Sequence, residues 1–102
     1  MTMKEPFSFE KGRVVRSTQG RDRGRSFLVL ESLGGDMVTI ADGLTHTLAR
    51  PKKKKIRHLH AEPIVVNWDT IRPEGGKVQD SDLRRALEQN GFAVERSLCK
   101  EG

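Results

Sequence analysis

Three arginines alternate along a short stretch that also contains two glycines. Arg21, Arg23 and Arg25 follow Gly20, and Gly24 lies among them. The guanidinium group is a planar set of donors that matches phosphate oxygens and also stacks on bases. Glycine has no Cβ, so the backbone turns tightly there and a large partner can approach its N–H groups. The stretch is therefore suited to bind a structured polyanion such as nucleic acid.

A second basic segment lies further along the chain. Four consecutive lysines occupy positions 52–55, and Arg57 and His58 follow them. Their charge adds a diffuse, salt-dependent attraction for polyanions. A lysine run also keeps small proteins soluble without binding anything specific, so this segment alone is a weak signal. If both basic segments lie on one rim of the fold, they form a single binding surface.

The distribution of charge favours this interpretation. The chain has 102 residues and a net charge of +5, and residues 11–60 hold twelve lysines and arginines against four acids. Such a concentrated positive field draws nucleic acid or an anionic membrane surface. The longest apolar run, 27–30, is far shorter than the roughly 20 residues that span a bilayer. We therefore expect a nucleic-acid partner and no membrane.

Cysteine use and the first residues indicate a compartment. Cys99 is the single cysteine and cannot form a disulfide within the chain, which is typical of a reducing environment. No apolar run near residue 1 resembles a signal peptide. We expect a cytoplasmic protein.

The basic segments are expected to lie next to short β-strands that are separated by turn residues. Runs rich in β-branched and aliphatic residues are bounded by glycines, and Asp42-Gly43 is a hairpin signal. These patterns predict four strands, at 12–17, 27–33, 37–41 and 44–49. Such even spacing favours a mainly β fold built as a small antiparallel barrel.

The end of the barrel is predicted from proline and the lysine run. Arg50-Pro51 should end the fourth strand, since proline has no N–H for the ladder. Residues 52–55 are then expected to be an exposed run, and a fifth strand around Ile56 and Leu59 would close the barrel. Prolines and a glycine pair mark 61–79 as a connector.

One helix is predicted near the C-terminus, at 80–91. Asp80 or Ser81 is suited to cap it, and Gly91 to end it in the left-handed conformation. Its apolar side chains lie on one stripe, formed by Leu83, Ala86 and Leu87. This stripe must dock on the barrel or on a partner, because so short a helix is not stable alone. The chain thus divides into an arm (1–11), a barrel (12–60), a connector (61–79), the helix (80–91) and a tail (92–102).

Several of these segments resemble a known family. Residues 12–17 and 20–25, with the apolar strand that follows, look like a KOW motif. Ala41-Asp42-Gly43 and 50–59 are similar to archaeal and eukaryotic large-subunit ribosomal proteins that contain a KOW domain. The resemblance to small bacterial KOW-domain RNA-binding proteins extends loosely over 75–90. It implies an SH3-like barrel that binds RNA, chiefly ribosomal RNA, as a ribosomal or ribosome-associated protein of the translation apparatus.

The resemblance also implies the site. It makes Gly20 the turn glycine of the motif and the arginines beside it phosphate contacts. The sparse aromatic residues argue against a single-strand stacking platform, so duplex or folded RNA is the expected ligand. The expected RNA-binding residues are Arg16, Gly20, Arg21, Arg23, Gly24, Arg25, Lys52, Lys53, Lys54, Lys55, Arg57 and His58.

Other functional classes have less support in the sequence. The three histidines, His46, His58 and His60, have no cysteine pair or acidic cluster to complete a metal site, so we expect no metal and no cofactor. No serine or cysteine has the sequence context of a catalytic nucleophile, so we expect no enzyme. A protein-interaction adaptor stays open as the alternative. It would use the barrel edge or the C-terminal helix, with the basic surface aiding only solubility.

Overall fold

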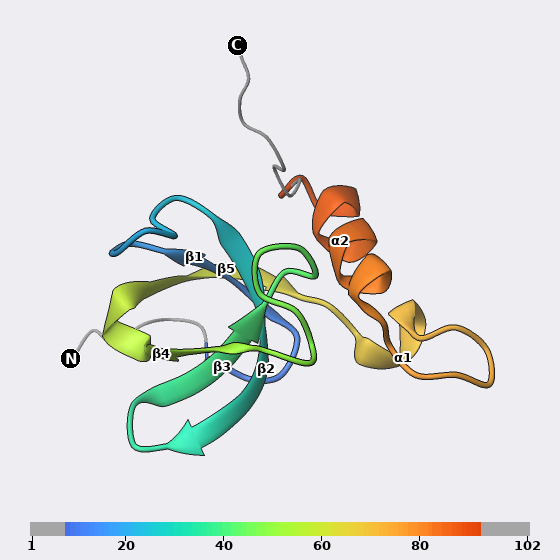
Figure 1. Cartoon of the computed structure of the whole chain (residues 1–102), viewed down its shortest axis with the longest axis horizontal. Coiled ribbons are helices and arrows are strands. Elements are labelled where there is room, and N and C mark those ends of the chain that lie inside the picture. The colour runs from blue at the N-terminus through green and yellow to red at the C-terminus, as the bar shows by residue number, and fades with distance from the viewer. Residues whose placement is uncertain (1–7, 93–102) are drawn as a thin grey trace, which may run out of the picture.

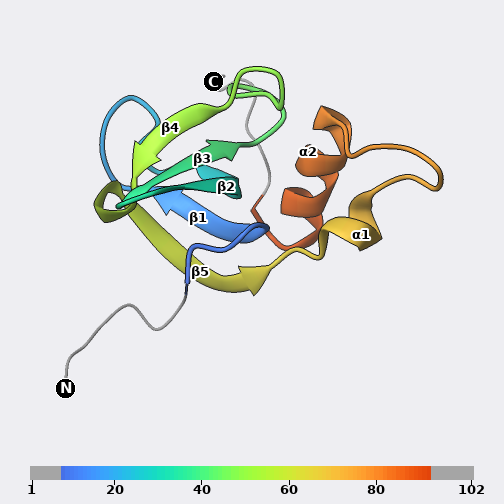
Figure 2. The same cartoon turned by 90° about the horizontal axis from the view of Figure 1, so that it is seen from below.

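The computed structural model describes residues 8–92, which form one five-stranded antiparallel sheet followed by two short helices (Figures 1 and 2). The prediction of a mainly β chain with a short C-terminal helix is confirmed. The strands are β1 (Arg13–Ser17), β2 (Ser26–Gly34), β3 (Met37–Ala41), β4 (Lys52–Lys55) and β5 (Leu59–Val65). A 3-10 turn, η1 (Ile56–His58), joins β4 to β5, and the helices are α1 (Trp68–Ile71) and α2 (Asp80–Gln89).

The sheet has the strand order β4-β3-β2-β1-β5, and every neighbouring pair is antiparallel. β4 and β5 are therefore its two edges, and backbone pairing does not close the sheet within the described residues. Register shifts in the β1–β5 and β2–β3 pairs interrupt the ladders. Such irregularities increase the local bend and twist of a sheet.

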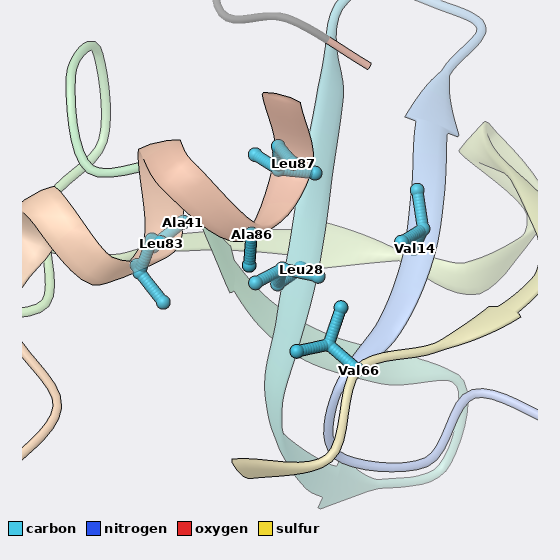
Figure 3. Close-up of a cluster of buried hydrophobic side chains, with 7 residues drawn as sticks. All are labelled: Val14, Leu28, Ala41, Val66, Leu83, Ala86 and Leu87. Atoms are coloured by element: carbon cyan, nitrogen blue, oxygen red, sulfur yellow. The ribbon is translucent and has the colours of Figure 1, made fainter. Parts of the chain in front are cut away.

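Both faces of the sheet bury apolar side chains. Successive residues of a strand point to opposite faces, so the neighbours Val14 and Val15 enter different clusters. One cluster contains Val15, Phe27, Val29, Val38, Ile40 and Leu59. The other, drawn in Figure 3, joins the opposite face to α2 and contains Val14, Leu28, Ala41, Val66, Leu83, Ala86 and Leu87.

The apolar stripe of α2 therefore docks on the sheet. Leu83 and Leu87 are fully buried, so burial against the strands supplies the stability that a ten-residue helix lacks in water. The cap of this helix is Gln79 and not Asp80 or Ser81. The carboxylate of Asp80 accepts a hydrogen bond from the Leu48 N–H (2.8 Å) and ties the helix to the loop between β3 and β4. Gly91 has a φ of +86°, as predicted.

The predicted strand at 44–49 is wrong, because one buried carboxylate takes the backbone donors that a strand would need. Asp42 is only 1% exposed and accepts hydrogen bonds from the N–H groups of Leu44, Thr45 and His46 at 2.9–3.0 Å. An aspartate that bonds to the following N–H groups favours a turn over a sheet ladder. Residues 42–51 are a loop.

The fourth strand is instead the lysine run itself, which was expected to lie exposed outside the sheet. Lys52–Lys55 pairs with β3, and Pro51 lies just before the ladder. β5 also continues to Val65, beyond the boundary predicted at residue 60. Pro63 indicated a connector in the sequence, but β5 is an edge strand, where a missing N–H on the solvent side is tolerated.

Candidate nucleic-acid interface

The arginine loop, residues 18–25, joins β1 to β2 and is compact. The Gly24 N–H donates to the Ser17 carbonyl (2.8 Å), and the Arg23 and Arg25 N–H groups donate to the Gly20 and Asp22 carbonyls (3.2 and 2.9 Å). These bonds form consecutive tight turns. Gly20 and Gly24 have φ values of +84° and +88°, a conformation that favours glycine. The predicted need for glycine at both positions is confirmed.

The turns present two of the three arginines to solvent. Arg21 and Arg23 are exposed, and no carboxylate of residues 8–92 pairs with either guanidinium. Arg25 is partly buried and has an interaction within the fold. Arg21 and Arg23 are therefore the arginines of the loop that are available to a phosphate.

The single acid of the arginine loop is held against the rest of the fold. An Asp22 Oδ2 oxygen lies 3.1 Å from His46 Nε2, and the Asp22 side chain is only 14% exposed. The ring of His46 packs in turn on Phe27, with 5.7 Å between ring centroids. The His46–Asp22 pair thus covers a negative charge that would repel phosphate.

The arginine loop contacts the second basic segment directly. Lys54 Nζ donates to the Gln19 carbonyl (3.1 Å), and the Thr18 N–H donates to the His58 carbonyl of η1 (2.9 Å). In both views the β1–β2 loop and the connection from β4 to β5 lie at the end of the molecule away from α2 (Figures 1 and 2). The two basic segments, which are far apart in the sequence, meet here.

The lysines of β4 do not all face the same way. Lys54 lies opposite Val38 and Lys53 opposite Thr39 on β3, so strand alternation sends these two side chains to opposite faces. Lys54 is 9% exposed, whereas the other three lysines are exposed. The predicted run therefore supplies an exposed basic edge and one buried lysine residue.

The remaining predicted residues differ in their availability. Arg57 is exposed in η1 and His58 is partly buried there. Arg16 lies on β1, where its guanidinium is 2.9 Å from a Glu62 carboxylate oxygen. This pairing offsets the Arg16 charge, so Arg16 contributes less to an electropositive surface than Arg21 or Arg23.

Two contacts of this interface have no signal in the sequence. The His46–Asp22 and Lys54–Gln19 pairs each join segments that are far apart in the chain. Neither follows a periodicity or a local motif, so only the folded arrangement reveals them.

The described residues show neither a metal-binding cluster nor a membrane-spanning helix. In 8–92, no group of three or more His, Cys, Asp or Glu side chains is placed to hold a metal ion. No helix in this range is long and apolar enough to cross a membrane. Cys99 lies outside the described residues. No family model matches the chain.

Proposed function

We propose that this chain is an RNA-binding protein of the translation apparatus, which contacts structured RNA, chiefly ribosomal RNA, in the cytoplasm. The contact between the arginine loop and β4 carries the proposal. It joins the arginine loop, through Thr18 and Gln19, to β4 and η1 at one end of the molecule. Cations from separate segments on one surface bind a polyanion more strongly than scattered charges do.

The fold is compatible with the family that the sequence resembles. A five-stranded antiparallel sheet in which a 3-10 turn joins the two edge strands is consistent with an SH3-like barrel. Together with the KOW-like residues at 12–17 and 20–25, it supports the proposal of a KOW domain whose β1–β2 loop contacts RNA.

The placement of the aromatic rings favours folded RNA over single strands. Among residues 8–92, Phe27 is buried, and Phe9, Trp68 and Phe92 pack against the two apolar clusters. A single-strand platform needs exposed rings on which successive bases stack. Exposed guanidinium and ammonium groups instead suit the phosphates of an A-form backbone, whose wide minor groove is recognised largely by shape.

The adaptor alternative has less support. The apolar stripe of α2 is used inside the fold, so it does not offer a docking surface for a partner protein. The two sheet edges carry the lysines of β4 and Pro63 of β5. Lysine and proline on edge strands discourage the addition of another strand. RNA binding is therefore the better-supported function.

Sedimentation of a cell lysate on sucrose gradients tests the proposal. The full chain should migrate with the large ribosomal subunit at low salt and leave it as salt rises, because phosphate contacts are salt-dependent. The Arg21→Ala/Arg23→Ala variant should shift to light fractions at a lower salt concentration. Migration of the wild type in light fractions at every salt concentration would contradict the proposal.

A further inference from the structure

One lysine of the proposed interface is buried. Lys54 is 9% exposed, and its ammonium donates to the Gln19 carbonyl at 3.1 Å. Lysine is almost never buried without a partner, because removing its charge from water is unfavourable. No carboxylate of residues 8–92 lies within ion-pair distance of this ammonium. The Gln19 carbonyl is therefore the hydrogen-bond partner of this ammonium group.

The register of β4 explains how the side chain reaches the loop. Lys54 lies opposite Val38, a member of the cluster that contains Val15 and Phe27. On this face the alkyl part of the lysine side chain packs beside apolar groups, and the ammonium group lies beyond them. A Cβ at Gly20 would lie 3.4 Å from Lys54 Nζ. The ammonium therefore sits directly beside the first turn of the arginine loop.

We propose that Lys54 positions the arginine loop and does not itself bind RNA. The Gln19 carbonyl also accepts a hydrogen bond from the Ser17 hydroxyl (2.9 Å) within the same limb of the loop. The bond from Lys54 adds an anchor from β4 to this limb, which precedes Arg21 and Arg23, so that their guanidinium groups are arranged before RNA arrives. A glycine-containing loop without this bond would sample more conformations, and RNA affinity falls in proportion to the fraction of binding-competent loops. The inference rests on the proposed RNA function, but the bond and its effect on the loop can be measured without RNA.

The neighbouring lysine provides a charge-matched control. Lys54→Met removes the ammonium and keeps an alkyl chain, and Lys53→Met removes the same charge from an exposed position on the opposite face. Lys54→Arg restores a cationic donor. If Lys54→Met does not fold, Lys54→Gln, whose shorter side chain also loses the ammonium, takes its place.

Amide hydrogen exchange of the free protein tests the positioning role. The loop amides that donate hydrogen bonds, those of Arg23, Gly24 and Arg25, are compared with core amides of β2 in the same variant. We expect Lys54→Met to raise the loop-to-core ratio of exchange rates about tenfold, as local opening becomes easier. Lys53→Met should leave the ratio unchanged, and Lys54→Arg should recover most of the protection. An unchanged ratio in Lys54→Met would overturn the inference.

RNA titrations at several salt concentrations separate positioning from direct contact. Lys54→Met should lower the affinity for a ribosomal RNA duplex fragment about tenfold at every salt concentration and leave the slope of log K against log salt unchanged, since no phosphate contact is lost. A slope smaller in magnitude by about 0.9 would mean that Lys54 contacts phosphate, and it would overturn the inference. If the wild type does not bind RNA, the proposed function fails, while the exchange ratio still decides whether Lys54 holds the loop.

Discussion

His46 Nε2 lies 3.1 Å from an Asp22 carboxylate oxygen and joins the arginine loop to the 42–51 loop. Asp22 stands between the two exposed arginines in sequence, where a free carboxylate would compete with phosphate for the guanidinium groups. We therefore expect the pairing to matter for the proposed RNA binding as well as for packing.

Loss of the histidine should weaken RNA binding through the freed carboxylate. We expect His46→Ala to lower RNA affinity about fivefold, because Asp22 then becomes available to Arg21 and Arg23. Adding Asp22→Asn to this variant should recover most of the loss, which a double-mutant cycle by fluorescence anisotropy would measure. His60→Ala, at an exposed position of β5, is the control. Equal affinities of His46→Ala and His60→Ala would refute this role.

The exposed arginines should be direct contacts. Arg21→Ala/Arg23→Ala should reduce RNA affinity about 30-fold or more, because two charge-assisted hydrogen-bonding groups are lost. Circular dichroism should be unchanged, since both side chains are exposed. The control is Arg72→Ala/Lys77→Ala, which removes the same charge from exposed positions outside the sheet. A similar loss in both variants would show that only net charge matters.

The α2 stripe should behave as core. Leu87 is fully buried against the sheet, so Leu87→Ala should lower the free energy of unfolding by about 3 kcal/mol. Gln89→Ala, on the exposed side of the helix, should change it by less than about 0.5 kcal/mol. Urea denaturation measures both. Unchanged stability in Leu87→Ala would mean that the stripe is free for a partner, as an adaptor that uses the C-terminal helix requires.

Two glycines with the same backbone conformation should differ sharply in their tolerance of alanine. Gly43 and Gly24 both have positive φ, +81° and +88°. A Cβ at Gly43 would lie 2.2 Å from the Asp80 carbonyl oxygen, whereas a Cβ at Gly24 meets nothing within 4 Å. Gly24→Ala should lower the free energy of unfolding by about 1–2 kcal/mol through backbone strain alone. Gly43→Ala should lower it clearly more. Similar thermal stabilities of the two variants would show that the 42–51 loop does not pack on α2 in this way.

Much of the sheet was predictable from local patterns. The strands expected at 12–17, 27–33 and 37–41 agree with β1, β2 and β3 within one or two residues, because alternating apolar side chains and bounding glycines act locally. The strand expected at 44–49 failed for a reason that alternation does not reveal. The Asp42 carboxylate accepts hydrogen bonds from the N–H groups that follow it. It does so because it is buried in the fold, which the local sequence does not show.

The candidate interface was predictable only in part. The glycine and arginine pattern predicted a tight loop, and the turns at Gly20 and Gly24 confirm it. The lysine run gave no sign that it would be a strand, or that Lys54 alone among the four would be buried. That difference follows from the register of β4 against β3, which is a property of the folded sheet.

The salt dependence of RNA binding tests the central claim most directly. If about six cationic groups from the arginine loop, β4 and η1 neutralise phosphates together, log K for a ribosomal RNA fragment should fall against log salt with a slope of about −4 to −5. In Arg21→Ala/Arg23→Ala the magnitude of the slope should fall by about 1.4 to 1.8. A wild-type slope near zero, or a slope unchanged by the double substitution, would contradict the account.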